Sequence, residues 1–423
     1  MTGQVFDPNG DHLLDPPPEV TKAELARIPP IISVDDHVVE PVDLFDQFLP
    51  AKWDGHPDRP HVQRRGIASL GFEGGTSYQI EYTDSPDAPQ ADCWIYAGTC
   101  NPLKRHIAAV GYPREQMTLT PATYDTMRPG CYDPTARLAD MDLNGVRASL
   151  CFPTMAGFAG RTFLQGTDRD LALDCVRAYN DWTYHVWSAA DPQRLVPLAL
   201  MPLWDPDLAA TEAQRAIDRG VRAIAFPELV HNLGLPSLHS GAWERFFAVC
   251  ADAEAALCAH IGTGGATPVA SDGPPAVQAS LSSLNSAACL ADFIFSGVLE
   301  RHPNLRLSLA EGQIGWVPFQ LERMDDVWVE HRAWGGVAGT LSMPPSDYFR
   351  RQVYGCFFRD PHGVANLDAI GVDNVTYETD YPHTDSTFPY TRQVAAELMR
   401  GVPDDVVDKV MWQNAARLLH LPN

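Results

Sequence analysis

The sequence predicts an α/β protein, a (β/α)8 TIM barrel with an inserted, partly β region after the first strand. Helix-like segments alternate with buried, strand-like segments from residue 131 to the C-terminus. The strand-like segments number eight when the apolar run at residues 30–34 is included. Alternation of this kind is typical of βα units and a parallel sheet. Eight units favour a closed barrel over an open doubly wound sheet.

The predicted strands are short apolar segments, and all but the first follow a helix-like segment. The helix before the second strand ends at Gly145 and the helix before the fourth ends at Gly220, which fits the frequent use of glycine just after a helix. The eight predicted strands cover residues 30–34, 146–152, 195–201, 221–226, 256–260, 305–310, 352–358 and 374–378.

The domain organisation follows from length and local composition. A single barrel with insertions reaches 423 residues, so the length does not require two domains. Residues 1–28 are rich in Pro and Asp and predict an irregular N-terminal arm, and residues 29–423 predict the barrel. Within it, residues 51–130 mix glycine turns with short alternating segments, which indicates an inserted, partly β region that covers a site.

Charge and cysteine content narrow the possible partners and location. The chain carries 31 basic and 54 acidic residues, a formal net charge of -23. Such a surface repels phosphates and anionic lipids, which argues against nucleic acid and membrane partners. No apolar run of about 18 residues predicts a membrane span, and the N-terminus does not resemble a signal peptide. Nine cysteines without a CxxC pair predict free thiols and a cytoplasmic location.

Polar residues of metal-binding type stand where several predicted strands end. In a barrel these ends carry the catalytic groups. Alternate residues of an extended segment face the same side, so Asp35 and His37 can converge while Asp36 points to the surrounding shell or a turn. Nitrogen and oxygen ligands suit Zn²⁺ and also Mn²⁺ or Fe²⁺. The predicted metal ligands are Asp35, His37, His260 and Asp380.

Each of these residues alone has an ordinary structural interpretation as a turn former, a core histidine or a helix cap. Two imidazoles and two carboxylates at one barrel mouth favour a metal site. We expect Asp380 to accept a proton in catalysis, and Glu311 is a candidate acid or base, a further ligand or a member of an ion pair. His383 is a candidate to orient a ligand or substrate. Arg359 is a candidate to bind a substrate carboxylate or to pair with Asp360.

The segments "ISVDDHVVEP", "AHIG", "HPNLRLSLAEGQIGWVPFQLERMD" and "YETDYPHTD" resemble those of a known family. It comprises the amidohydrolase-related metal-dependent hydrolases of the aminocarboxymuconate-semialdehyde decarboxylase type. The resemblance runs from about residue 30 to the C-terminus, without most of residues 51–130. It implies a (β/α)8 barrel, one divalent metal that is commonly zinc, and a homo-oligomer. It also implies metal ligands at His37, His260 and Asp380.

The sequence departs from the family pattern at two positions. Asp35 stands where the family often has a histidine, which adds one negative charge to the ligand set. Glu311 stands where members often carry a catalytic histidine, so the decarboxylase mechanism does not transfer directly.

The expected function is that of a metal-dependent hydrolase that acts on a small organic acid, ester or lactone through a metal-activated water. The alternative is a non-oxidative decarboxylase of an aromatic or unsaturated carboxylic acid. A second alternative is a barrel that binds a small ligand without catalysis, against which the intact set of candidate ligands counts.

Overall fold

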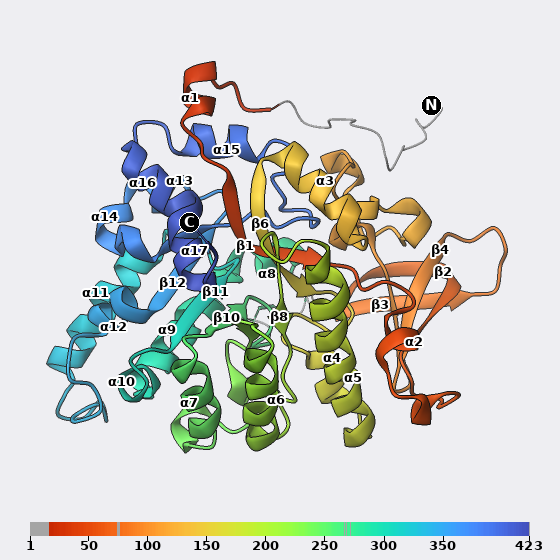
Figure 1. Ribbon diagram of the computed structural model, residues 1–423, viewed down its shortest axis with the longest axis horizontal. Coiled ribbons are helices and arrows are strands. Elements are labelled where there is room, and N and C mark those ends of the chain that lie inside the picture. Colours follow the sequence, from red (N-terminus) through yellow and green to blue (C-terminus); the bar gives the residue numbers. More distant parts are fainter. Residues whose placement is uncertain (1–16, 74–76, 266, 268, 271, 423) are drawn as a thin grey trace.

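The central sheet of the computed structural model is parallel and closes on itself (Figure 1). The structure describes residues 17–73, 77–265, 267, 269, 270 and 272–422. The order of the strand segments is β7-β6-β1-β13-β12-β11-β10-β9-β8. Only Pro197 separates β7 from β8, so these two ends of the order are halves of one strand and the barrel has eight strands. The segments are β1 Ile31–Val38, β6 Val146–Pro153, β7 Leu195–Val196, β8 Leu198–Ala199, β9 Ala223–Ala225, β10 Ala256–His260, β11 Arg306–Ala310, β12 Val353–Phe357 and β13 Val375–Tyr377.

All eight predicted strands are confirmed, but the first is longer than expected. The sequence predicted that it ends at residue 34, whereas β1 continues to Val38. Its pairing with β6 shifts register between Ser33 and Asp36 and then resumes, with Asp36 opposite Cys151 and His37 opposite Phe152. The acidic residues and the histidine therefore lie within the strand, where the ladder fixes their directions.

Helices surround the barrel on its outside (Figure 1). Gly145 and Gly220 end the helices before β6 and β9 with φ of 74° and 93°, a conformation that favours glycine. The helices are α1 Lys22–Ala26, α2 Leu44–Phe48, α3 Pro134–Asn144, α4 Arg161–Gln165, α5 Arg169–Trp182, α6 Pro206–Asp218, α7 Glu244–Asp252, α8 Pro275–Leu281, α9 Ser283–Phe295, α10 Val298–Arg301, α11 Val317–Glu330, α12 Pro345–Gln352, α13 Pro361–Ala365, α14 Leu367–Ile370, α15 Thr391–Leu398, α16 Asp404–Asp408 and α17 Asn414–Leu419.

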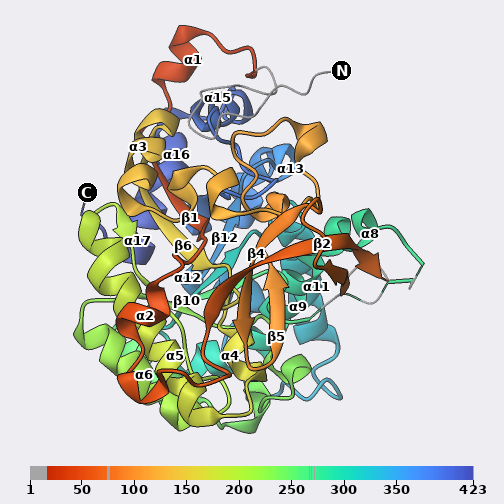
Figure 2. The same cartoon turned by 90° about the vertical axis from the view of Figure 1, so that its right-hand side faces the viewer.

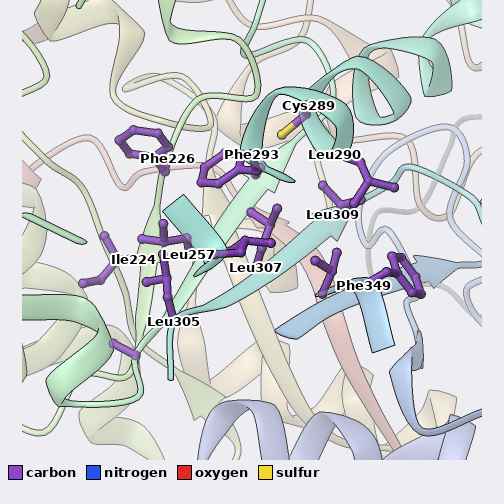
Figure 3. Close-up of a cluster of buried hydrophobic side chains, with 14 of the residues drawn as sticks. Ile224, Phe226, Leu257, Cys289, Leu290, Phe293, Leu305, Leu307, Leu309 and Phe349 are labelled. Atoms are coloured by element: carbon purple, nitrogen blue, oxygen red, sulfur yellow. The ribbon is translucent and has the colours of Figure 1, made fainter. Parts of the chain in front are cut away.

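Apolar side chains fill the space between the strands and the outer helices (Figure 3). Leu257 of β10 and Leu307 of β11 are fully buried beside Phe293 of α9 and Phe349 of α12. Complete burial of one such side chain contributes roughly 1.5–3 kcal/mol. This packing holds β10 and β11 rigidly, and the carboxyl ends of these strands carry His260 and Glu311.

The inserted region contains a second, antiparallel sheet, as the sequence predicted. Its order is β3-β2-β4-β5, and it flanks one side of the barrel (Figures 1 and 2). The segment after this sheet reaches the loop that follows β13, because the N–H of Ala109 donates to the carbonyl of Pro382 at 2.7 Å. The insertion therefore lies against a loop at the barrel mouth. Its strands are β2 His61–Glu73, β3 Ser77–Thr83, β4 Gln90–Tyr96 and β5 Thr99–Pro102.

The predicted N-terminal arm is only partly irregular. Residues 1–16 lie outside the described residues, and the remainder of the arm contains α1. Thr21 and Glu24 form a reciprocal capping box at its start, which satisfies N–H groups that a short helix otherwise leaves open. Of the helices that the structure describes, none has both the length and the apolar character to cross a membrane. All nine cysteines are free thiols.

Candidate metal centre

Strand β1 directs its two acidic residues to opposite sides. Asp35 and His37 are fully buried at the barrel mouth. Asp36 faces the other way and accepts hydrogen bonds from the hydroxyl groups of Ser149 and Thr379 and from the N–H of Tyr381. Asp36 thus joins β1 to β6 and to the loop after β13 through hydrogen bonds and does not form a turn. Of the two acids, only Asp35 lies on the same side of β1 as His37.

His260 ends β10 and is oriented by its own backbone. Its Nδ1 lies 2.6 Å from the carbonyl oxygen of Ile261, so Nδ1 carries the proton and donates it to that oxygen. The unprotonated Nε2 therefore faces the barrel mouth with its lone pair. A backbone bond of this kind is how metal-binding histidines are commonly fixed in one tautomer.

Asp380 lies three residues after the end of β13 in a left-handed conformation with φ of 49°. Its N–H donates to the carbonyl of Asp35 at 3.0 Å, which ties the loop to β1. Strain of this kind in a residue other than glycine persists where the surrounding structure enforces it, and often at functional sites. The loop thereby brings the carboxylate of Asp380 beside His37.

The imidazole Nε2 atoms form the centre of the cluster. Nε2 of His37 lies 3.1 Å from Oδ1 of Asp380, 3.6 Å from Oδ1 of Asp35 and 3.4 Å from Nε2 of His260. Nε2 of His260 lies 3.4 Å from Oδ2 of Asp35 and 3.3 Å from Oε2 of Glu311. The structure therefore brings Asp35, His37 and His260 together with Glu311, while Asp380 lies with His37 and His383 in a second group that shares His37 with the first.

The cluster fits a divalent cation. Both carboxylate oxygens of Asp35 and Oδ2 of Asp380 are buried and have no hydrogen-bond partner among the described residues, while Oδ1 of Asp380 faces the ring nitrogens of His37 and His383 at 3.1 Å. Buried polar atoms are nearly always paired, so three unpaired oxygens in one place need an explanation. A cation bound by these oxygens and by the ring nitrogens of His37 and His260 supplies one, with a ligand set suited to Zn²⁺ or Mn²⁺.

The pKa shifts of these side chains are those of a site that binds a cation. Burial and the neighbouring carboxylates Glu378, Glu311 and Asp380 raise the pKa of Asp35 well above its usual range. Burial lowers the pKa of His260 to about 4, so this imidazole is neutral at pH 7. Burial alone would raise the pKa of Asp380, but the charges and hydrogen bonds of His383 and His37 outweigh it and hold that pKa well below its usual range.

Glu311 follows β11 and faces both the cluster and a cavity. It has a φ of 57°, and its N–H donates to Oε2 of Glu378 at 3.0 Å. Burial and the charges of Asp380 and Glu378 raise the pKa of Glu311 well above its usual range. The cavity of about 240 Å³ is lined by Glu311 and His260 together with Phe158 and other residues of the loop and helices after β10. A small organic molecule bound there contacts the Glu311 carboxyl group.

Two buried acids beside the cluster were missed by the sequence analysis. Oε2 of Glu378 also accepts a hydrogen bond from the thiol of Cys356, and Oε1 of Glu228 accepts one from the hydroxyl of Ser286 at 3.0 Å. Burial raises the pKa of each of these two acids to about 8. Both acids follow apolar strands, as His260 and Glu311 do, and this shared pattern could have identified them.

The remaining predicted residues lie around the cluster. The ring of His383 stacks on that of His37 with centroids 3.6 Å apart, and its Nδ1 lies 3.1 Å from Oδ1 of Asp380. Arg359 is exposed two residues after the end of β12, and its contact with a substrate carboxylate stays a prediction. Asp360 does not serve a substrate, because its carboxylate accepts from the N–H groups of Ile314, Gly315 and Gly363 and begins α13.

A closed (β/α)8 barrel with histidine and carboxylate side chains gathered at the carboxyl ends of its strands defines an α/β-barrel enzyme. The chain belongs to the amidohydrolase family, because the family model described as amidohydrolase matches residues 63–421. The resemblance predicted from the sequence is confirmed. The match also includes most of the inserted region, which the predicted resemblance left out.

Similar proteins support this assignment. A 2-amino-3-carboxymuconate-6-semialdehyde decarboxylase of Dictyostelium discoideum is 26% identical over 306 residues, which cover 69% of this chain and 78% of the relative. The crystal structure of an amidohydrolase from Mycobacterium avium subsp. paratuberculosis matches with a TM-score of 0.65 and 20% identity, over 92% and 99% of the two chains. A manganese complex of 5-carboxyvanillate decarboxylase from Novosphingobium aromaticivorans matches with a TM-score of 0.61 and 16% identity, over 93% and 97%.

Proposed function

We propose that the protein is a metal-dependent non-oxidative decarboxylase of an aromatic or unsaturated carboxylic acid. The observation that carries this proposal is the position of the Glu311 carboxyl group, which lines the cavity 3.3 Å from His260 of the cluster. Decarboxylation replaces a carbon–carboxylate bond by a carbon–hydrogen bond and therefore needs a proton donor at the reacting carbon. The similarity to a decarboxylase supports this function over the hydrolysis that the sequence first suggested.

Asp35, His37, His260 and Asp380 would hold one divalent ion, zinc or manganese. Bound there, the ion supplies a positive charge that binds and polarises the substrate's carboxylate and a neighbouring oxygen. The manganese in the similar 5-carboxyvanillate decarboxylase makes manganese as good a candidate as the zinc that the sequence suggested.

The chain's own residues account for the proton. Glu311 lines the cavity 3.3 Å from His260 and donates a proton to the carbon that loses CO₂. The carboxylate that remains takes up a proton from solvent through the small exposed part of its side chain. Phe158, whose ring centroid lies 4.0 Å from that of His260, covers the cluster and limits the access of water.

Hydrolysis of an ester or lactone is the second candidate function. The low pKa of Asp380 keeps its carboxylate ionised, and its Oδ2 has no hydrogen-bond partner among the described residues. An ionised carboxylate at this place can accept a proton from an attacking water.

Separate measurement of CO₂ and of acid release distinguishes the two functions. We expect the protein, supplied with Mn²⁺ or Zn²⁺, to release CO₂ from a member of a panel of hydroxybenzoates and unsaturated acids. His260→Ala should abolish this release, whereas exchange of the exposed His239 for Ala should not. Acid release from esters or lactones without CO₂ from any acid would assign the protein to hydrolysis. Ligand binding without either product would favour a non-catalytic barrel.

Metal removal should make the stability of the protein depend on pH. The folded-state pKa values of Asp35, Glu228, Glu311 and Glu378 are all raised, to about 8 for Glu228 and Glu378. The stability that these protonated acids contribute is complete below their unfolded pKa of about 4 and is lost as the pH rises through the folded values. We therefore expect the melting temperature of chelator-treated protein to fall between pH 5 and 8.

A bound cation should oppose this loss. At a concentration one hundred times its dissociation constant it contributes about 2.7 kcal/mol, so the melting temperature at pH 8 should rise on addition of Mn²⁺. Scanning calorimetry with and without metal measures both effects. Equal curves at pH 5 and pH 8 without metal, in wild type and in Glu378→Gln, would contradict the expectation.

A further inference from the structure

The chain uses lysine sparingly, and one lysine stands apart. Only Lys22, Lys52, Lys104 and Lys409 occur among the 31 basic residues. Lys52 and Lys409 form ion pairs with Asp174 and Asp373 at the surface, and Lys22 is exposed. Lys104 follows β5 of the inserted sheet and is only 9% exposed. A buried lysine in a chain that otherwise prefers arginine needs a specific reason.

The ammonium group of Lys104 has no carboxylate partner among the described residues. It donates to the carbonyl of Pro102 at 2.9 Å and lies 4.3 Å from the ring centroid of Tyr78. Burial lowers the pKa of Lys104 to about 8, so the group remains largely charged at pH 7. A buried charge without a counter-charge is costly.

Tyr78 and His106 complete a group with Lys104, which we call the insertion triad. The hydroxyl of Tyr78 lies 2.9 Å from Nε2 of His106. Nδ1 of His106 is buried and has no hydrogen-bond partner among the described residues. Tyr78 is 40% exposed, which leaves the triad open on one side. The triad therefore offers a cation and further hydrogen-bonding groups to a molecule that enters from solvent.

The insertion triad lies beside the candidate metal centre. The carbonyl of His106 accepts a hydrogen bond from the N–H of Thr384 at 3.1 Å, in the loop that also carries Asp380 and His383. Burial and the charges of Lys104 and His383 lower the pKa of His106 to about 3. His383 in turn stacks on His37. Figure 2 shows the inserted sheet beside the barrel, and of the triad Tyr78 lies on its strand β3 while Lys104 and His106 follow β5.

We propose that the insertion triad binds a second carboxylate of the substrate, whose first carboxylate lies at the candidate metal centre. This inference rests on the proposed function and narrows it to dicarboxylic aromatic or unsaturated acids. The ammonium of Lys104 and the hydroxyl of Tyr78 supply charge-assisted hydrogen bonds to a carboxylate. The cavity residues Ser282 and Asn285 carry no charge, and their side chains already donate to the carbonyls of Ala279 and Gly265. Lys104 is thus a specificity-determining residue.

Calorimetric titration with two unreactive probes tests the proposal. Benzene-1,3-dicarboxylate and benzoate differ by one carboxylate. The Mn²⁺-supplied wild-type protein should bind the dicarboxylate at least about tenfold more tightly than benzoate, and Lys104→Met, which keeps an unbranched side chain but removes the charge, should remove this preference. Lys52→Met, which removes an exposed lysine, should retain it. Equal affinity for the two probes in the wild type, or a preference that survives in Lys104→Met, overturns the proposal.

A second measurement on the wild type covers the case in which Lys104→Met does not fold. Acetylation of the four lysines, read by mass spectrometry, should slow at Lys104 when the dicarboxylate is present, while Lys22, Lys52 and Lys409 react as before. Unchanged acetylation of Lys104 at a saturating concentration of the dicarboxylate contradicts the proposal. The release of CO₂ is scored separately. A Lys104-dependent preference without CO₂ release refutes the decarboxylase alone, and CO₂ release without the preference refutes the triad site alone.

Discussion

Exchange of Asp35 for Asn should lower kcat/KM at least about a thousandfold and stabilise the metal-free protein at the same time. The several kcal/mol that a bound metal contributes to charge stabilisation correspond to about this factor. The stabilisation arises because the Asp35 carboxyl group is fully buried, unpaired and surrounded by Glu311, Glu378 and Asp380. Asn has nearly the same shape and removes the charge.

Metal analysis, kinetics and thermal unfolding of Asp35→Asn measure the three consequences. We expect less bound metal after dialysis, the loss of activity, and a higher melting temperature than that of chelator-treated wild type at pH 8. A variant that keeps a full equivalent of metal and wild-type kinetics would contradict the role of Asp35.

The neighbouring Asp36→Asn is the matched control, because it makes the same chemical change one residue along β1. Asp36 accepts hydrogen bonds from four groups and interacts with the buried charge of Arg137. Asn replaces one accepting oxygen by an NH₂ group, so at least one of these buried hydrogen bonds is lost, which costs about 1–3 kcal/mol. Asp36→Asn should therefore lower the melting temperature, the opposite of the effect at Asp35.

The contrast between Asp35 and Asp36 shows which features of the site could be predicted from the sequence. The period of two in an extended segment was enough to separate Asp35 and His37 from Asp36, and the structure places them on the predicted sides. The register shift between Ser33 and Asp36 was not visible in the sequence, because it arises from pairing with residues more than a hundred positions away. For the same reason the sequence predicted an end to β1 at residue 34.

The barrel was predictable because each βα unit repeats a local pattern, whereas contacts between distant segments were not. The short alternating segments of the inserted region predicted partly β structure, but the order of its strands depends on pairings that composition does not determine. The sequence did not predict a site role for Lys104, because only the contact between its segment and the loop after β13 brings it near the candidate metal centre. Glu228 and Glu378 stand out once burial is known, since a buried acid without a cation is rare.

Exchange of Glu311 for Gln should lower kcat about 10²- to 10⁴-fold, the usual range for a lost general acid. Gln keeps the size and hydrogen-bonding shape of the side chain but cannot release a proton to carbon. The left-handed backbone at this position should tolerate Gln, because Gln313 already adopts a φ of 54° two residues later. Metal content and melting temperature should therefore stay close to those of the wild type. Glu322→Gln, on the exposed face of α11, serves as the control and should leave kcat unchanged.

The pH profile separates a proton donor from a residue that only shapes the cavity. If Glu311 is the proton donor, the active form is the protonated one, and wild-type kcat should fall as the pH rises through its pKa. Glu311→Gln does not titrate, so its residual kcat should lose this decline on the alkaline side. A variant with reduced kcat but an unchanged alkaline decline would show that another group donates the proton, with Glu378, which accepts a hydrogen bond from the N–H of Glu311, as the candidate. In that case Glu311 only positions neighbouring groups, and Glu378→Gln should abolish the decline of kcat at alkaline pH.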